Sequence, residues 1–246
     1  MPQEVIYATV AVPLYNMGNI AGLCFAGLMA QHTRYRWELI VCEEQNDDMF
    51  GEERLRQYKF PNCCDVIYIP LKERESLSIK WRIIALRARG KCFLLQAGDD
   101  YSHPKRIENT VDVFMRGYTY YDEQRAYFYS FVHKKTIIFD PHPMNPHPCR
   151  VNIAWQTKII KHLPIAHKSG CVDHWIYDSL KTKGVIRKFR DKKIHLGVFT
   201  FGHNKISRTG KYFEHPHQPF RKSSIDIRKY IKELMLYEHT DNNDRI

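Results

Sequence analysis

The sequence predicts an α/β protein with a mostly parallel central sheet flanked by helices. Two observations lead to this fold class. Apolar, β-branched runs of strand length alternate with segments whose apolar residues recur at helical spacing, and each strand-like run ends in polar, acidic or proline residues. Strands that alternate with helices in this way form parallel sheets with right-handed crossover connections. The 246 residues are enough for one sizeable core, and a hydrophobic fraction of 43% is typical of a folded globular chain.

The first half of the chain contains the regular alternation. The expected strands are residues 5–13, 37–42, 65–70 and 91–96. The expected helices are residues 20–31, 78–89 and 104–116. The first strand is almost continuously apolar, which favours burial on both faces. The second helix is expected to have basic residues outside and an apolar face made of Ile79, Ile83, Ala85, Leu86 and Ala88. Gly90 is expected as its C-cap.

The second half has a different character. Residues 125–139 form a long aromatic, β-rich stretch, and the alternation of Tyr127, Tyr129 and Phe131 predicts one face of a strand. Residues 140–149 form a loop in which His142, His147 and Cys149 could bind zinc, although the prolines between them favour an extended chain. Helices are expected at residues 172–183 and 225–237, the second one amphipathic.

Charge and composition suggest the class of partner. The chain has 38 Lys and Arg against 27 Asp and Glu, a formal net charge of +11, which favours an anionic partner such as a nucleotide sugar, a nucleic acid or anionic lipid. No stretch has the roughly twenty apolar residues of a membrane-spanning helix. Seven cysteines without a disulfide-type spacing indicate reduced thiols. Together these features predict a cytoplasmic protein.

Two pairs of acids follow strands of the predicted sheet. Glu43 and Glu44 follow one strand, and Asp99 and Asp100 follow another. Because ligands bind beyond the carboxyl ends of parallel strands, the fold should bring both pairs to one edge. Asp99 and Asp100 suit a Mg²⁺ or Mn²⁺ ion that neutralises a diphosphate leaving group. They could instead only cap the helix that opens near Pro104.

These motifs make the chain resemble a family-2 inverting glycosyltransferase of GT-A fold, from about residue 5 to about residue 207. The matching residues are Pro13, Tyr15 and Asn16 after the first strand, Glu43 and Glu44 after the second, Arg82 and then Ala88 to Gly90 around the next helix, and Ala97 to Asp100 after the fourth strand. Ala97 stands where the family's Asp-x-Asp motif has its first Asp. Asp99 matches the second Asp, which in the family touches the metal.

The resemblance implies roles for these residues toward a nucleotide-sugar donor. Pro13, Tyr15 and Glu44 would lie nearest the base and ribose, with Glu43 beside them. Carboxylate bonds to a uracil imide and to ribose hydroxyls favour a UDP-sugar. Arg82 could pair with a diphosphate oxygen, although a helix Arg can equally face solvent.

The resemblance also implies a base and a further metal ligand. Asp173, preceded by Val172 where the family has Glu, matches the residue that deprotonates the acceptor hydroxyl. An acid at this place could instead only complement a helix dipole. His203 matches a loop histidine that can complete the metal site, so the expected metal ligands are Asp99, Asp100 and His203. Packing is the alternative role for this histidine.

The implied organisation is a GT-A domain over residues 1–207, with a nucleotide-sugar half at 1–100 and an acceptor half at 101–207, followed by a basic helical extension at 208–246. The expected acceptor is a hydroxyl of a glycan or lipid-linked glycan, with Arg228, Lys229 and Lys232 meeting an anionic membrane on its cytoplasmic face. One alternative is a transferase acting on hydroxymethylated bases of viral DNA, in an infected host's cytoplasm. Another is an inactive binding module, because Ala97 and Val172 depart from the motifs.

Overall fold

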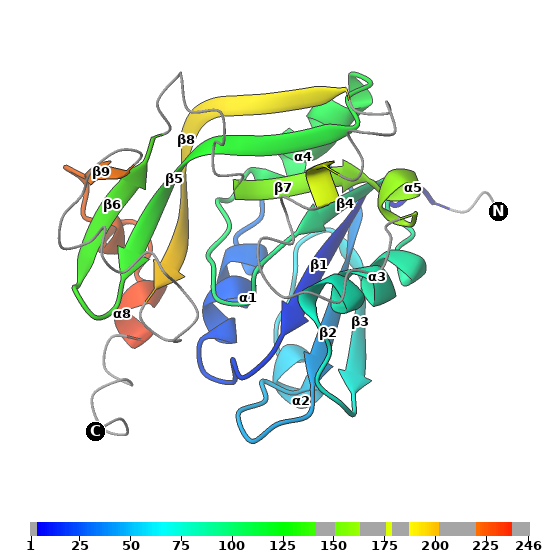
Figure 1. Cartoon of the computed structure of the whole chain (residues 1–246), viewed down its shortest axis with the longest axis horizontal. Helices are drawn as coiled ribbons and strands as arrows, with labels where there is room; N and C mark the ends of the chain where they lie inside the picture. The colour runs from blue at the N-terminus through cyan, green and yellow to red at the C-terminus, as the bar shows by residue number, and fades with distance from the viewer. Residues whose placement is uncertain (1–3, 141–150, 163–175, 179–186, 202–219, 238–246) are drawn as a thin grey trace.

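The computed structural model of the chain describes residues 4–140, 151–162, 176–178, 187–201 and 220–237 (Figure 1). The described strands form one nine-stranded mixed sheet in the order β3-β2-β1-β4-β7-β5-β6-β9, and β8 pairs with β5 outside this path. The expected α/β fold with a central sheet is therefore confirmed, and parallel pairing is concentrated in its first half.

The parallel half consists of β1 (Ala8–Leu14), β2 (Trp37–Glu44), β3 (Cys63–Leu71) and β4 (Cys92–Leu95). β1 lies between β2 and β4 and runs parallel to both, and β3 pairs with β2. Every residue of β1, β2 and β4 is buried. This burial explains the continuous apolar runs, because helices cover both faces of these strands.

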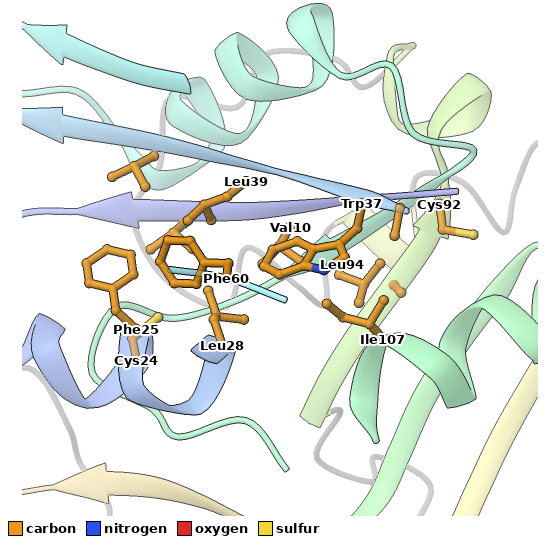
Figure 2. Close-up of a cluster of buried hydrophobic side chains, with 14 of the residues drawn as sticks. Val10, Cys24, Phe25, Leu28, Trp37, Leu39, Phe60, Cys92, Leu94 and Ile107 are labelled. Carbon is orange, nitrogen blue, oxygen red and sulfur yellow. The ribbon is translucent and has the colours of Figure 1, made fainter. Parts of the chain in front are cut away.

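Helices pack on both sides of the parallel half. They are α1 (Ala21–Met29), α2 (Glu52–Leu55), α3 (Leu77–Arg87), α4 (Arg106–Met115) and α5 (Thr157–Ile160). On one face, α1 and α4 contribute Phe25 and Ile107 to a core built around Trp37 and Leu94 (Figure 2). On the other face, α3 and α5 pack against the sheet through residues such as Ile84. The result is a three-layer arrangement.

Two details of α3 differ from the expectation. Of the face expected to be buried, Ala85 and Ala88 are buried but Leu86 is exposed. The helix also buries Ser78, Lys80 and Trp81, so its inward face is only partly the expected one. Lys80 turns inward because its ammonium group pairs with Glu44 and donates to the carbonyl oxygen of Leu14. Gly90 is not the C-cap, since the helix ends at Arg87. A Cβ on Gly90 would lie 2.3 Å from the carbonyl carbon of Ala8, so glycine here permits close approach to β1.

The second half of the sheet is mixed. It contains β5 (Tyr120–Ser130), β6 (Lys135–Phe139), β7 (Val151–Gln156), β8 (Lys188–Phe201) and β9 (Phe220–Lys222). The aromatic, β-rich stretch 125–139 is confirmed as β structure and forms much of the hairpin of β5 and β6, which turns near Lys134, a residue with φ of 48°. Tyr127 and Tyr129 face one core cluster and Phe128 faces another, which confirms their alternation.

The C-terminal segment packs against the main body. Its expected helix over 225–237 is replaced by a 3₁₀ turn, η1 (Ile227–Lys229), and a short helix, α8 (Glu233–Tyr237). Ile227, Ile231 and Leu234 enter the same core cluster as Leu23 of α1, so tertiary packing overrides one continuous helix. Figure 1 shows α8 below the β5–β6 hairpin. Apart from Asp140, the expected loop at 140–149 lies outside the described residues, together with its candidate zinc ligands His142, His147 and Cys149. Most of the expected helix at 172–183 also lies outside them.

Candidate active site

The carboxyl ends of β1, β2 and β4 meet at one edge of the sheet. Leu14 of β1 lies opposite Glu43 of β2, and β4 runs parallel on the other side of β1. The loop after β4 approaches β1 closely, because a Cβ on Gly98 would lie 2.2 Å from Cδ2 of Leu14. The segments that carry the two acidic pairs therefore meet at one edge, as expected.

Short-range polar contacts shape the loops at this edge. Asn16 adopts a φ of 54°, a left-handed conformation that asparagine tolerates, and it turns the chain directly after β1. Asn46 accepts a hydrogen bond from the backbone N–H of Asp48 at 2.9 Å, which forms an Asx turn after β2. Ser76 caps α3 by accepting from the N–H of Ile79. These turns fix the loops around the edge.

Glu44 and Lys80 form a buried ion pair at the centre of the edge. Lys80 Nζ lies 2.8 Å from Glu44 Oε1 and donates to the carbonyl oxygen of Leu14 at 3.0 Å. The backbone N–H of Glu75 donates to the same Oε1 at 2.7 Å. Within the described part of the chain, no group donates to the buried Oε2 of Glu44. This oxygen is thus an unused acceptor, although the Glu44 side chain is only 1% exposed.

Tyr15 lies beside this pair, directly after β1 and two residues beyond the buried Pro13. Lys80 Nζ is 5.5 Å from the centre of the Tyr15 ring, and the guanidinium carbon of Arg74 is 4.6 Å from it. Cations over an aromatic face are stabilised by the ring quadrupole. The half-buried ring, the two cations and the carboxylate thus lie within one small region.

Glu43 has a different environment from its neighbour. Its carboxylate accepts from the backbone N–H groups of Phe50 and Gly51, at 2.7 and 2.9 Å, and from the Tyr68 hydroxyl at 2.7 Å. Burial and this carboxylate together raise the pKa of Tyr68. Glu43 therefore holds the loop after β2 in place. Both glutamates are the last residues of the buried β2 rather than part of an acidic loop.

Asp99 and Asp100 also differ from each other. Asp100 is buried, and its Oδ1 accepts from the backbone N–H of Thr200 in β8 at 3.0 Å. Burial, and then the charge of Asp99, raise the pKa of Asp100 well above its usual range. Asp99 is half-buried, and its carbonyl oxygen accepts from the Thr200 hydroxyl at 2.6 Å. The loop is therefore fastened to β8, with Asp99 the more accessible carboxylate.

The remaining expected site residues are placed less fully. Arg82 is half-buried on α3, two residues beyond Lys80. Asp173 and His203 lie outside the described residues. The structure thus gathers Pro13, Tyr15, Glu43 and Glu44 at one edge, near the loop that carries Asp99 and Asp100.

Two polar residues at this edge were missed from the sequence. Lys80 was placed on the outer face of its helix, and a single lysine among apolar residues gives no sign of its partner. Arg106 is 2% exposed and donates to the Gln96 side chain and to the carbonyl oxygen of Leu95. Ser102 also donates to Gln96, so these hydrogen bonds hold the start of the loop after β4 in place.

The comparison with protein families decides the assignment. A family model described as glycosyl transferase family 2 matches residues 9–177, more than half of the chain. The chain belongs to glycosyl transferase family 2. The expected resemblance is therefore confirmed, and the family membership supports a nucleotide-sugar glycosyltransferase.

Solved structures support the fold of this family member. The structure of S. aureus TarS residues 1–349 is 12% identical, with 79% of this chain and 60% of that chain covered and a TM-score of 0.57. The same portion of TarS in complex with UDP-GlcNAc is 13% identical over 95% of this chain and 66% of that one, with a TM-score of 0.54. The chain thus spans about 60% of the first of these structures. No curated protein sequence matches it.

Two features bear on contact with a membrane: the length and apolar character of the helices, and the basic residues of the C-terminal segment. None of the described helices combines the length and the apolar character needed to cross a bilayer. Of the basic residues expected to meet anionic lipid, Arg228 pairs with the carboxylate of Asp226 at 2.8 Å, whereas Lys229 and Lys232 are exposed.

Proposed function

We propose that this family-2 protein transfers a sugar from a UDP-sugar to a hydroxyl group of a glycan or lipid-linked glycan. The observation that carries the proposal is the buried Glu44 Oε2, which lacks a donor among the described residues and lies beside Tyr15 and Lys80. A uracil imide or a ribose hydroxyl supplies the donor that this oxygen lacks. The structures of S. aureus TarS determined with UDP and with UDP-GlcNAc support the choice of nucleotide.

The edge also fits a hard divalent ion. Mg²⁺ and Mn²⁺ prefer carboxylate oxygens, and the accessible Asp99 provides one at the edge where the diphosphate would lie. Asp100 Oδ1 already accepts a bond from β8, so we assign Asp100 mainly to holding the loop. His203 remains our candidate for a further ligand. When bound, the ion neutralises negative charge that develops on the departing diphosphate.

The chain's own residues would orient the two substrates. Glu44 and Tyr15 hold the nucleoside, Lys80 and Arg74 place positive charge beside it, and Arg82 meets a diphosphate oxygen. We assign to Asp173 the removal of the acceptor proton, so that the hydroxyl attacks the anomeric carbon from the side opposite the leaving group, with inversion.

A donor screen tests this function. Thermal shift and sugar-nucleotide hydrolysis would be measured with and without Mn²⁺ on the native chain and on Asp99→Ala and Asp173→Ala. We expect Asp99→Ala to lose the metal-dependent stabilisation by UDP-sugar, and Asp173→Ala to keep donor binding but lose transfer. If both variants transfer sugar at the native rate, the roles are wrong.

The acceptor class needs its own test. The net charge of +11 would favour either an anionic membrane or a nucleic acid. We expect the chain to float with vesicles that contain anionic lipid and to bind duplex DNA weakly. Tight DNA binding that weakens steeply with salt, together with no vesicle binding, would instead indicate a DNA acceptor.

A further inference from the structure

A second cluster of polar groups lies in the mixed half of the sheet. His103 follows the loop after β4, Glu123 belongs to β5 and His195 to β8. One potential metal-ligand atom from each of these three side chains lies within 4.8 Å of the other two. His103 Nε2 is 2.7 Å from Glu123 Oε1, and the two imidazole rings stack with their centres 4.1 Å apart. Three ligand groups from three separate segments thus converge.

A second layer of hydrogen bonds orients these groups. Asp191 Oδ2 lies 3.0 Å from His195 Nε2. Asn152 Nδ2 donates to Glu123 Oε2 at 2.5 Å, and the Tyr121 hydroxyl donates to Glu123 Oε1 at 3.2 Å. Carboxylates that bind the far side of an imidazole, and donors that hold a carboxylate, are typical partners of metal-ligating residues.

The cluster is buried on one side and open on the other. The His103 and Glu123 side chains are 3% and 1% exposed, while that of His195 is 16% exposed. His195 and Asp191 line a hollow of about 720 Å³ beside α4, together with Lys193. An ion could enter from this hollow.

We propose that His103, Glu123 and His195 bind a divalent transition-metal ion, with one coordination position open toward the hollow. Two imidazoles and one carboxylate are a ligand set typical of Zn²⁺ and of non-haem Fe²⁺, unlike the oxygen ligands that Mg²⁺ prefers. The ion takes the place of the proton between His103 Nε2 and Glu123, and the ring of His103 stays neutral because its one proton moves to Nδ1. Because Asp191 holds Nε2 of His195, Nδ1 is the nitrogen left for the ion, and the ring turns out of its stack with His103 to point this lone pair at it.

This site is separate from the donor edge but is joined to it. Thr200, which holds Asp99 and Asp100, is five residues beyond His195 on β8, at most roughly 17 Å of extended chain. His103 is the other link, because it ends the loop that begins with Asp99. An ion bound here therefore fixes that loop to β5 and β8. The proposal does not depend on the identity of the sugar donor.

Cobalt binding to the full chain tests the site. After chelator treatment, Co²⁺ would be titrated into the native chain and the visible ligand-field absorption recorded, with Zn²⁺ added in competition. We expect one Co²⁺ per chain with absorption typical of nitrogen and oxygen ligands, displaced by Zn²⁺. His195→Phe keeps a ring beside His103 and should lose this absorption, and Asp191→Asn should weaken binding 10- to 100-fold, roughly the loss typical of second-layer partners.

Controls separate this site from the other histidines of the chain. His162 is exposed, so His162→Ala should bind Co²⁺ as the native chain does. Circular dichroism would report whether each variant folds, and Glu123→Gln provides a second ligand variant if His195→Phe does not. A native chain without the absorption, or a folded ligand variant with the native spectrum and stoichiometry, would overturn the proposal and leave the cluster as a hydrogen-bonded network.

Discussion

Two buried carboxylates, Glu44 in the parallel half of the sheet and Glu123 in the mixed half, have opposite hydrogen-bonding environments. In the parallel half, Glu44 binds Lys80 through one oxygen, and its other oxygen has no donor within the described residues. In the mixed half, both oxygens of Glu123 accept bonds, from His103, Asn152 and Tyr121. Leaving a buried acceptor unsatisfied costs about 1–3 kcal/mol.

This difference predicts that the two carboxylates bind different kinds of ligand. The environment of Glu44 is incomplete and gains a hydrogen bond when a ligand donates one. The environment of Glu123 is complete, so only a cation that displaces a proton can improve it. We therefore expect substitutions at Glu44 to act on nucleotide binding and those around Glu123 to act on metal binding.

The largest effect should come from breaking the pair at Glu44. Lys80→Met keeps the length of the side chain but leaves the Glu44 carboxylate buried without its cation. Loss of one partner from a buried ion pair costs about 3–5 kcal/mol. Chemical denaturation should show this loss of unfolding free energy, whereas Lys72→Met, at an exposed position, should change little. A loss at Lys80 as small as that at Lys72 would contradict the pairing.

Replacing Glu44 itself sharpens the comparison with Glu43. Glu44→Gln removes the charged acceptor proposed to bind the nucleoside, and hydrogen bonds to charged groups contribute about 1.5–3 kcal/mol. UDP affinity measured by calorimetry should therefore fall about 10- to 100-fold. Both variants should lower the melting temperature, because Glu44→Gln leaves the buried Lys80 without its carboxylate and Glu43 holds the loop after β2. Only Glu43→Gln should keep UDP affinity close to the native value. Equal effects of both variants on UDP affinity would remove the distinction.

The sequence predicted the parallel half better than the mixed half. Continuous apolar runs reveal buried parallel strands, and the rule that ligands meet their carboxyl ends placed Glu44 and the Asp99 loop at one edge. Periodicity failed for Lys80, because a buried cation is stabilised by a partner distant in sequence. It failed again for His103, Glu123 and His195, whose meeting depends on how β5 and β8 pair.

The contact between the two donor-edge loops can be tested at Gly98. Gly98→Ala would place a Cβ 2.2 Å from Leu14 Cδ2 and 2.8 Å from Met17 Sδ, and Leu14 is fully buried. Overpacking of this kind costs about 1–3 kcal/mol. Thermal unfolding should show the loss, and Leu14→Val, which lacks the clashing atom, should reduce the added cost of Gly98→Ala. Independent, additive effects of the two substitutions would contradict the close approach.

The smallest effect concerns the two acids of the Asp99 loop and depends on pH. The pKa of Asp100 is raised in the folded chain, so the folded state holds a proton there more tightly than the unfolded state does. Stability from this group is therefore present at acidic pH and falls as the pH rises above the ordinary carboxyl range. Asp100→Asn can still accept from the Thr200 N–H but carries no charge, so it should avoid this loss.

In metal-free buffer, the melting temperature of Asp100→Asn should exceed the native value by about 2–4 °C at neutral pH, which corresponds to about 1 kcal/mol in a chain of this size. The gain should shrink in mildly acidic buffer. A gain that is equal at both pH values would show that the buried carboxyl of Asp100 does not titrate between them, and would assign the stabilisation to packing.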